Sequence, residues 1–262
     1  MGLNEGVIFN FIEHTVNEDG FRTITHPGGL AVYIAILVAC LVGAYLLGSI
    51  NWAIVISKVM YHDDIRKYGS GNAGMTNMMR TYGKGPALFT LVGDIMKVLI
   101  SIFVAGVFFG FQYVWALSFN PICYLTGLFA MIGHIKPVYY GFKGGKGVLC
   151  FAAMGLMLSP LPFLFLLLCF ILIVLITKYI SLGSIICAAF YPILLQGSMQ
   201  TITSAGYNFN IVLITIAEAV ILIVCHRTNI QRLINHTENK FKFKKSKKAS
   251  DAEPTEQSGD EA

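Results

Sequence analysis

Seven long apolar segments occur between residues 31 and 225, and they constrain the fold of this chain more than any other feature. A helix needs about 20 apolar residues to cross a bilayer, and the 13% of charged residues lies well below the roughly 25% of soluble domains. The runs are continuous rather than alternating, which argues against a transmembrane β-barrel. The sequence therefore predicts an all-α, polytopic membrane protein with about seven transmembrane helices, over Ala31–Met60, Pro86–Phe111, Val114–Ile132, Gly145–Leu158, Phe163–Thr177, Ile180–Leu195 and Ile211–Cys225.

Basic residues predict how this bundle is oriented. Lys and Arg collect between the first two segments, between the third and fourth, at Lys178 and after Cys225, while the connections on the other side carry none. Pro160 and Pro162 are expected to end one helix and begin the next. That break puts every basic loop on one side, so the positive-inside rule predicts an outside N-terminus and a cytoplasmic C-terminus.

The two ends of the chain differ in composition from its middle. Residues 1–30 are predicted to form an extracytoplasmic arm, and residues 31–235 the integral membrane domain. Residues 236–262 form a cytoplasmic tail, first basic and then acidic, that is expected to be disordered. The basic run Lys240–Lys248 directly follows the membrane domain, as expected of a segment attracted to anionic lipid rather than to nucleic acid.

Cysteine usage gives no sign of a metal or a cofactor. All six cysteines lie in apolar segments or at their edges, without a CxxC pair or the Cys/His spacing of a zinc site. We expect free thiols, no metal and no cofactor.

The polar stretch Lys67–Lys84 has the composition of an anion site. Its glycines permit turns that point several N–H groups into one space, and Arg80 supplies a planar fork suited to phosphate. No acidic residue interrupts the stretch. A merely solvated loop is the alternative, but the density of donors favours phosphate binding by Gly69, Ser70, Gly71, Asn72, Thr76, Asn77 and Arg80.

A second stretch, Gly133–Val148, places Lys143 and Lys146 among four glycines with no acidic residue nearby. It is not a Walker A loop, because Gly147 rather than Ser or Thr follows Lys146. The physical logic is similar, since glycine lets a backbone approach phosphate and the next helix presents its positive end. Positive-inside lysines in a turn are the alternative.

Three smaller features complete the set of candidates. His226 and Asn229 share a helical face directly after the last segment, although a lone histidine there is more often an interfacial anchor. Ser184 lies near Lys178 at the predicted cytoplasmic boundary. Asp94 and Lys97, three residues apart within the second segment, are expected to form a structural ion pair.

Taken together, the stretches "GSGNAGMTN", "GHIKPVYYGFKGGKGVLC" and "HRTNIQRL" resemble the bacterial acyl-phosphate:glycerol-3-phosphate acyltransferase family in order and spacing. The resemblance covers roughly Ala31 to Asn235. The departures, Met75, Val98, Tyr139 and Leu149–Cys150, remove none of the donors assigned to the site.

The resemblance implies a seven-helix enzyme of the bacterial plasma membrane with a cytoplasmic active site. The reaction it implies joins an acyl chain from acyl phosphate to the 1-hydroxyl of glycerol 3-phosphate and yields lysophosphatidate. It also implies the lipid bilayer as surroundings and a functional link to the soluble enzyme that makes acyl phosphate. With the residue chemistry above, it assigns catalysis to Ser70, Arg80, Lys146, His226 and Asn229, and substrate phosphate binding to Gly69, Gly71, Asn72, Thr76, Asn77, Gly144, Gly145 and Ser184.

A membrane carrier for organic phosphate anions is the alternative function. Glycine loops and basic side chains would serve it equally well, but a carrier needs cations within reach of both faces. The sequence places them on one face, which favours the enzyme.

Overall fold

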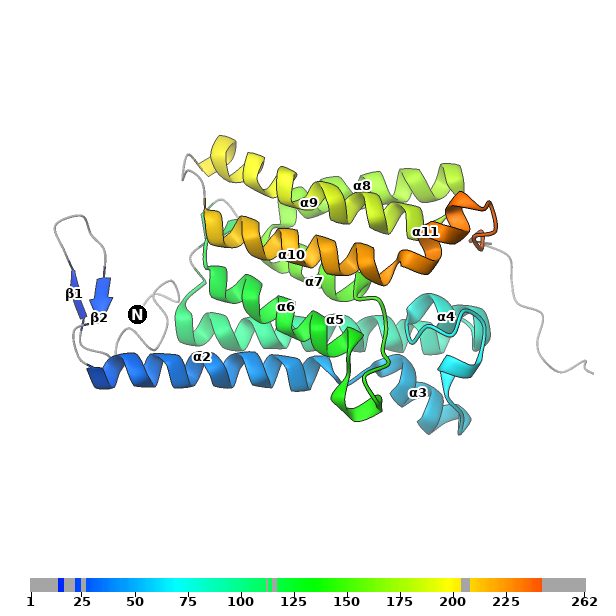
Figure 1. The fold of residues 1–262 in the computed structure, drawn as a ribbon, viewed down its shortest axis with the longest axis horizontal. Helices are drawn as coiled ribbons and strands as arrows, with labels where there is room; N and C mark the ends of the chain where they lie inside the picture. Colours follow the sequence, from blue (N-terminus) through cyan, green and yellow to red (C-terminus); the bar gives the residue numbers. More distant parts are fainter. Residues whose placement is uncertain are drawn as a thin grey trace, which may run out of the picture.

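The computed structural model describes residues 14–16, 22–24, 27–111, 113–114, 117–203 and 208–241. Long helices lie roughly along one direction, and short helices gather at one end of the bundle (Figure 1). The elements in chain order are β1 (His14–Val16), β2 (Arg22–Ile24), α2 (Pro27–Gly48), α3 (Trp52–Tyr61), η1 (Ile65–Lys67), α4 (Met75–Thr81), α5 (Lys84–Phe109), β3 (Tyr113–Val114), β4 (Leu117–Ser118), α6 (Pro121–Ile135), η2 (Val138–Tyr140), α7 (Val148–Leu158), α8 (Pro160–Thr177), α9 (Ile180–Thr203), α10 (Phe209–Cys225) and α11 (Arg227–Ile234).

Each predicted apolar segment contains a helix, and the all-α class is confirmed. The predicted break is also confirmed, because α7 ends at Leu158 and α8 begins at Pro160. The expected start of the third segment at Val114 is wrong. The antiparallel pair of β3 and β4 occupies that stretch, and α6 begins only where the Asn120 side chain caps it and Pro121 fits its first turn.

Helix length supports fewer spans than the sequence predicts. Within the described residues, four helical stretches are long and apolar enough to cross a membrane, and the bent pair of α10 and α11 would make a fifth. α7 is shorter, and α6 has 15 residues. The count of seven and the orientation in the membrane therefore stay predictions.

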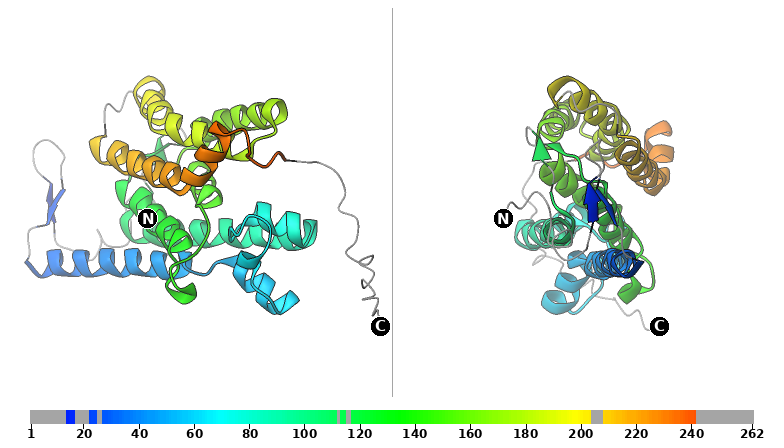
Figure 2. Two further views of the ribbon diagram at one scale, coloured as in Figure 1. Left: turned by 45° about the vertical axis from the view of Figure 1, so that its right-hand side comes forward. Right: turned by 90° about the vertical axis from the view of Figure 1, so that its left-hand side faces the viewer.

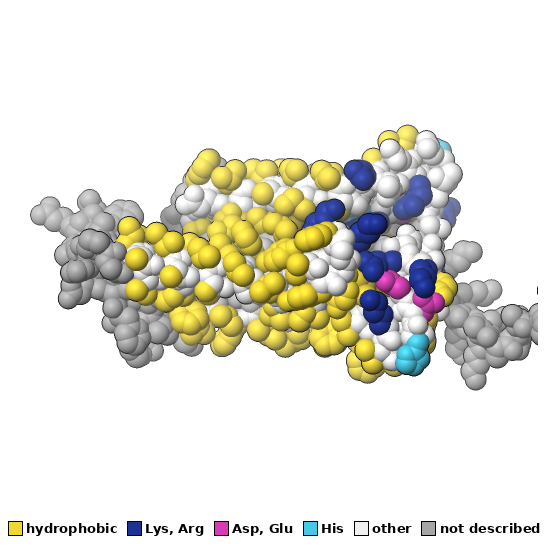
Figure 3. All heavy atoms as spheres, turned by 60° about the horizontal axis from the view of Figure 1, so that its bottom comes forward, with side chains coloured by type: hydrophobic (Ala, Val, Ile, Leu, Met, Phe, Trp, Pro, Cys, Tyr) yellow, Lys and Arg dark blue, Asp and Glu magenta, His cyan; other side chains and the backbone are white. Residues whose placement is uncertain are grey.

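The connections that carry the candidate residues all lie at one end of the bundle. α3, α4, α11 and the loop between α6 and α7 all lie at this end, and the two further views agree (Figures 1 and 2). In the face shown in Figure 3, the Lys and Arg side chains gather at this end, beside a broad apolar surface. The fold thus brings together candidate residues that lie far apart in the sequence.

α2 and α6 cross with almost no space between their backbones. A Cβ added to Gly48 would lie 2.1 Å from the carbonyl oxygen of Ala130, and one added to Gly133 would lie 2.2 Å from that of Tyr45. Small residues allow this close approach of helices in membranes. The crossing fixes α6 next to the break between α2 and α3.

Two apolar clusters support the basic end. The larger one lies among α5, α6, α7, α9 and α10, with Tyr124, Met131 and Met154 fully buried. The smaller one lies beneath the first polar stretch and includes Ala73 and Met78, both fully buried. Close van der Waals packing of such side chains stabilises helix contacts in a membrane, so the loops rest on a packed base.

Candidate active site

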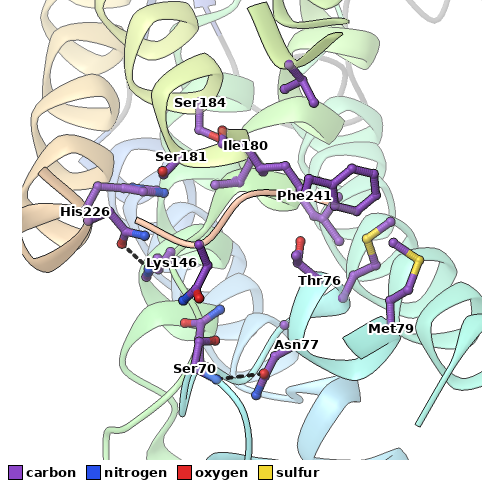
Figure 4. A pocket seen from close by; sticks show the side chains of 18 of the residues that line it. Ser70, Thr76, Asn77, Met79, Lys146, Ile180, Ser181, Ser184, His226 and Phe241 are labelled. Carbon is purple, nitrogen blue, oxygen red and sulfur yellow. Dashed lines mark hydrogen bonds between the residues drawn. The ribbon is translucent and has the colours of Figure 1, made fainter. Parts of the chain in front are cut away.

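A cavity of about 540 Å³ opens at the basic end and brings the three polar stretches together. Figure 4 shows Ser70, Lys146 and His226, which come from different segments, around this space. The predicted site residues that line it are Ser70, Asn72, Thr76, Asn77, Arg80, Lys146, Ser184, His226 and Asn229. The predicted glycines Gly69, Gly71, Gly144 and Gly145 are not part of its wall.

Asn77 holds the first loop in shape. Its Nδ2 donates to the carbonyl oxygens of Tyr68 (2.9 Å) and Ile65 (3.3 Å), and its Oδ1 accepts from the backbone N–H of Ser70 (3.0 Å; Figure 4). Gly69 has φ +58°, and a Cβ there would lie 2.2 Å from Asn77 Oδ1. Because this amide is occupied by the loop, its role is to support the loop that presents Ser70.

Gly144 and Gly145 are tied to the end of α6. Their backbone N–H groups donate to the carbonyl oxygens of Ile135 (3.2 Å) and His134 (3.1 Å). These amides are therefore already used, and the glycines contribute space rather than phosphate donors. Lys146 follows immediately, and its Nζ donates to Oδ1 of Asn229.

Gly145→Ala is expected to damage the whole loop. A Cβ at this position would lie 2.1 Å from Nε2 of His134 and 2.7 Å from the carbonyl oxygen of Ala73. The sequence alone predicts mainly a higher KM for glycerol 3-phosphate; with this packing we also expect a lower thermal unfolding temperature in detergent. Gly141→Ala is no clean comparison because its φ is +65°, whereas Gly85, with open space around it, is a suitable control. An unchanged unfolding temperature would contradict the close packing.

Arg66 joins the first loop to the second. Its Nη1 donates to the carbonyl oxygens of Tyr140 and Lys143, both at 2.9 Å, while Nε and Nη2 bind the carboxylate of Asp64. From the sequence, Arg66 counts only as one of the basic residues that predict the orientation of the bundle. Its link is visible only once residues more than 70 positions apart meet.

Arg66→Lys should lower kcat/KM about tenfold, because one ammonium cannot reproduce the fork that reaches two carbonyls and a carboxylate. Kinetics in reconstituted membranes would measure this. Lys67→Arg is the matched control, since Lys67 is exposed and pairs only with Asp63 on the same loop. Wild-type kinetics in Arg66→Lys would show that the link is dispensable.

His226 lies at the end of α10, where its ring is oriented by the helix. Its Nδ1 lies 2.8 Å from the carbonyl oxygen of Leu222, to which it donates. Burial is the main cause that lowers the pKa of His226, and the cation of Lys146 lowers it further. The ring is therefore neutral at pH 7, with the lone pair on Nε2 free to accept a proton.

Although the two basic loops lack acidic residues near their candidate donors, the cavity itself does contain an acidic side chain from elsewhere in the chain. Glu238 also lines the cavity and accepts hydrogen bonds from Ser181 (2.9 Å), Asn229 (2.7 Å) and Arg232 (2.8 Å). Burial acts to raise the pKa of Glu238, but these three hydrogen bonds outweigh it and lower the pKa. The carboxylate is thus neutralised locally, by Arg232 above all.

The segment around Glu238 lies within the predicted tail. Phe241 N–H donates to the carbonyl oxygen of Lys178 (2.7 Å), and Phe241 lines the cavity. Residues up to Phe241, which the sequence assigns to the tail, thus contact the helical domain, and the tail boundary stays a prediction. Residues 242–262 lie outside the described part of the chain.

One wall of the cavity is apolar. Phe170, Ile171, Val174 and Leu175 of α8 form it, and the side chains of Ile171 and Leu175 are also exposed on the outer apolar surface. Other elements contribute the hydroxyl, amide and basic groups of the lining. Among the described residues, no three His, Cys, Asp or Glu side chains gather as metal ligands would.

A family model described as glycerol-3-phosphate acyltransferase matches residues 38–236. Among curated relatives, the glycerol-3-phosphate acyltransferase of Trichlorobacter lovleyi is 40% identical over 201 residues, covering 76% of this chain and 95% of the relative. That of Geobacter sulfurreducens is 41% identical over 199 residues, with 76% and 94% covered.

Two solved structures of PlsY, an integral membrane glycerol 3-phosphate acyltransferase, are similar to this fold. The glycerol 3-phosphate form has a TM-score of 0.68 at 34% identity and covers 79% of this chain and 96% of that one. The lysophosphatidic acid form has a TM-score of 0.66 at 33% identity and covers 79% and 95%. With the matched model and the curated relatives, these likenesses show that the chain belongs to the glycerol-3-phosphate acyltransferase family.

Proposed function

We propose that this chain transfers an acyl group from acyl phosphate to the 1-hydroxyl of sn-glycerol 3-phosphate at the cytoplasmic face of a bacterial plasma membrane. The observation that carries the proposal is one cavity with two chemically distinct walls. Arg80 and Lys146 face it on the polar side, and α8 forms the apolar side. A substrate with a phosphate head and an acyl chain needs both.

The reaction is a substitution at the acyl carbon. The glycerol hydroxyl oxygen forms the new bond to that carbon, the bond to the phosphate oxygen breaks, and phosphate leaves. Two groups can take the hydroxyl proton: Nε2 of neutral His226 and an oxygen of a substrate phosphate. Because acyl phosphate is already activated, the protein mainly orients the hydroxyl and stabilises the developing negative charge.

The carrier alternative is less well supported. It requires basic side chains that a phosphate could reach from both ends of the bundle. In the described part of the chain the candidate cations Arg80, Lys146 and Arg232 line one cavity at one end. An enzyme that takes a polar substrate from one aqueous phase needs no second entrance.

The donor is the feature that most sharply tests the proposal. With glycerol 3-phosphate saturating, purified protein in lipid vesicles should form lysophosphatidate from acyl phosphate, and none from acyl-CoA or acyl carrier protein. The cytoplasmic loops are short, and even weak protein–protein contacts bury several hundred Å². A link to the soluble enzyme that makes acyl phosphate then follows from the chemistry of supply.

Labelled donors with a common acyl chain, separated from product by chromatography, would measure this. Protein carrying Lys146→Ala is the control for non-enzymatic transfer, since acyl phosphate is reactive by itself. Comparable rates with acyl-CoA would contradict the donor assignment. Product absent with every donor would contradict acyl transfer altogether.

A further inference from the structure

Three ionisable side chains form a cluster at the wall of the cavity, and the proposed reaction does not use them. Nζ of Lys97 lies 2.9 Å from Oδ1 of Asp94, 2.9 Å from the carbonyl oxygen of Ile50 and 2.9 Å from Nδ1 of His134. All three ionisable side chains are at least 96% buried. An ammonium group has three N–H donors; here it bonds to Ile50 and His134, and it forms an ion pair with Asp94.

This arrangement determines the protonation of the histidine ring. Because Lys97 donates to Nδ1 of His134, that nitrogen has to offer its lone pair, and the proton of the neutral ring resides on Nε2. Asp94, whose Oδ1 lies 3.5 Å from Nδ1, balances the charge of the lysine. The N–H group at Nε2 of His134 therefore points away from Lys97 and Asp94.

Nε2 of His134 is directed at the place where the two substrate loops meet. An ideal Cβ on Gly145 would lie 2.1 Å from Nε2 and 2.7 Å from the carbonyl oxygen of Ala73. The same carbonyl accepts from Nδ2 of Asn51 (3.2 Å), and Gly145 N–H donates to the backbone of His134. The ring edge therefore lies against Gly145 in the loop before α7, where this loop meets the carbonyl of Ala73 in the loop before α4.

Both loops contribute residues to the cavity wall, and His134 and Asp94 also line the cavity. The first loop presents Ser70 and the second presents Lys146. A purely structural ion pair could be placed anywhere in α5, and apolar side chains of similar size would often stabilise the fold as well. Its location at the contact of the loops calls for another role.

Building on the proposed acyl transfer, we propose that His134 is a positioning residue for it. Its protonated Nε2 sets the separation of the two loops, and Lys97 and Asp94 hold the ring in the required tautomer and orientation. A shift of the ring would move Lys146 relative to Ser70, and with it the site for the phosphate of glycerol 3-phosphate. This extends the role expected for Asp94 and Lys97 beyond that of a structural pair.

Two substitutions of His134 distinguish the role of Nε2 from that of Nδ1. A glutamine amide can place its NH₂ group close to the position of Nε2, whereas the shorter asparagine amide reaches only the position of Nδ1. We expect His134→Asn to raise the KM for glycerol 3-phosphate about tenfold and His134→Gln to stay within about threefold of wild type. A destabilised but correctly built site would lower only the active fraction and thus kcat.

A double substitution tests the same proposal while His134 itself is kept. Asp94→Leu with Lys97→Met leaves no unpaired charge, so we expect the protein to fold. His134 then loses its partner at Nδ1, and the KM should rise about tenfold as well. Thr90→Ala is the control, since Thr90 is fully buried one turn earlier in α5 and bonds only to Pro86.

Equal KM values in the asparagine and glutamine variants of His134, or a wild-type KM in the double variant, would overturn the proposal. Equilibrium binding of radiolabelled glycerol 3-phosphate provides the same comparison without turnover. A wild-type protein that binds this ligand with the expected order of variants but forms no lysophosphatidate would contradict the proposed reaction and leave the positioning role standing.

Discussion

Lys146→Ala should lower the rate of lysophosphatidate formation at least a hundredfold while the protein still inserts into the membrane. The ammonium group lies at the cavity and is held by Asn229, whose amide in turn donates to Glu238. A charge-assisted contact to phosphate is worth about 1.5–3 kcal/mol in binding. It gains more where charge develops in the transition state, and each 1.4 kcal/mol is about tenfold in rate.

The same loop supplies the matched control. Lys143 lies three residues before Lys146 and is exposed, and only its backbone carbonyl takes part in the link to Arg66. Lys143→Ala removes the same charge from the same loop and should turn over at the wild-type rate. Near-normal turnover in Lys146→Ala, with equal protein in the membrane, would remove this residue from the site.

Arg80→Ala should produce a loss of similar size, at least about a hundredfold in kcat/KM. Arg80 lies in the last turn of α4, exposed and at the wall of the cavity. Its planar fork can bind two phosphate oxygens at once, which an ammonium group cannot. Arg80→Lys should therefore recover only part of the activity, and steady-state kinetics of the two variants would measure the difference.

Lys84 is the control for the charge of Arg80. It is exposed at the start of α5, four residues further along the chain, and it is not part of the cavity wall. Lys84→Ala should leave kcat/KM unchanged. If Lys84→Ala and Arg80→Ala reduced activity equally, the loss would reflect the net charge of this end rather than a specific contact.

The helices could be predicted because the local hydropathy of a continuous segment identifies a membrane helix. The break at Ser159 followed from two prolines, and the gathering of basic loops at one end followed from the distribution of Lys and Arg. The strand pair of β3 and β4 was missed because strands of two residues are too short to be told from a helix by hydropathy. Helix lengths, and thus the number of spans, depend on tertiary packing.

The site could be predicted where a residue type carries the chemistry by itself, as with Ser70, Arg80 and Lys146. It could not be predicted where the role depends on a distant partner. The amide of Asn77 could bind phosphate by its chemistry, but its NH₂ group already donates to backbone carbonyls of the same loop. Glu238 lies in a segment whose composition indicates disorder, yet it binds Asn229 and Arg232.

The crossing of α2 and α6 has a mechanical consequence. At Gly48 and Gly133 the two backbones are in direct contact, without a side chain between them that could rotate. We therefore expect α2 and α6 to move together as one rigid unit. Where α8 and α9 meet, a Cβ added to Gly183 would lie 2.8 Å from the ring of Phe170 and 3.4 Å from Cγ2 of Val174. Both are side chains, which can rotate. If the proposed reaction takes place here, we expect a longer acyl chain to be accommodated by movement of α8, while α2 and α6 keep the polar groups in position.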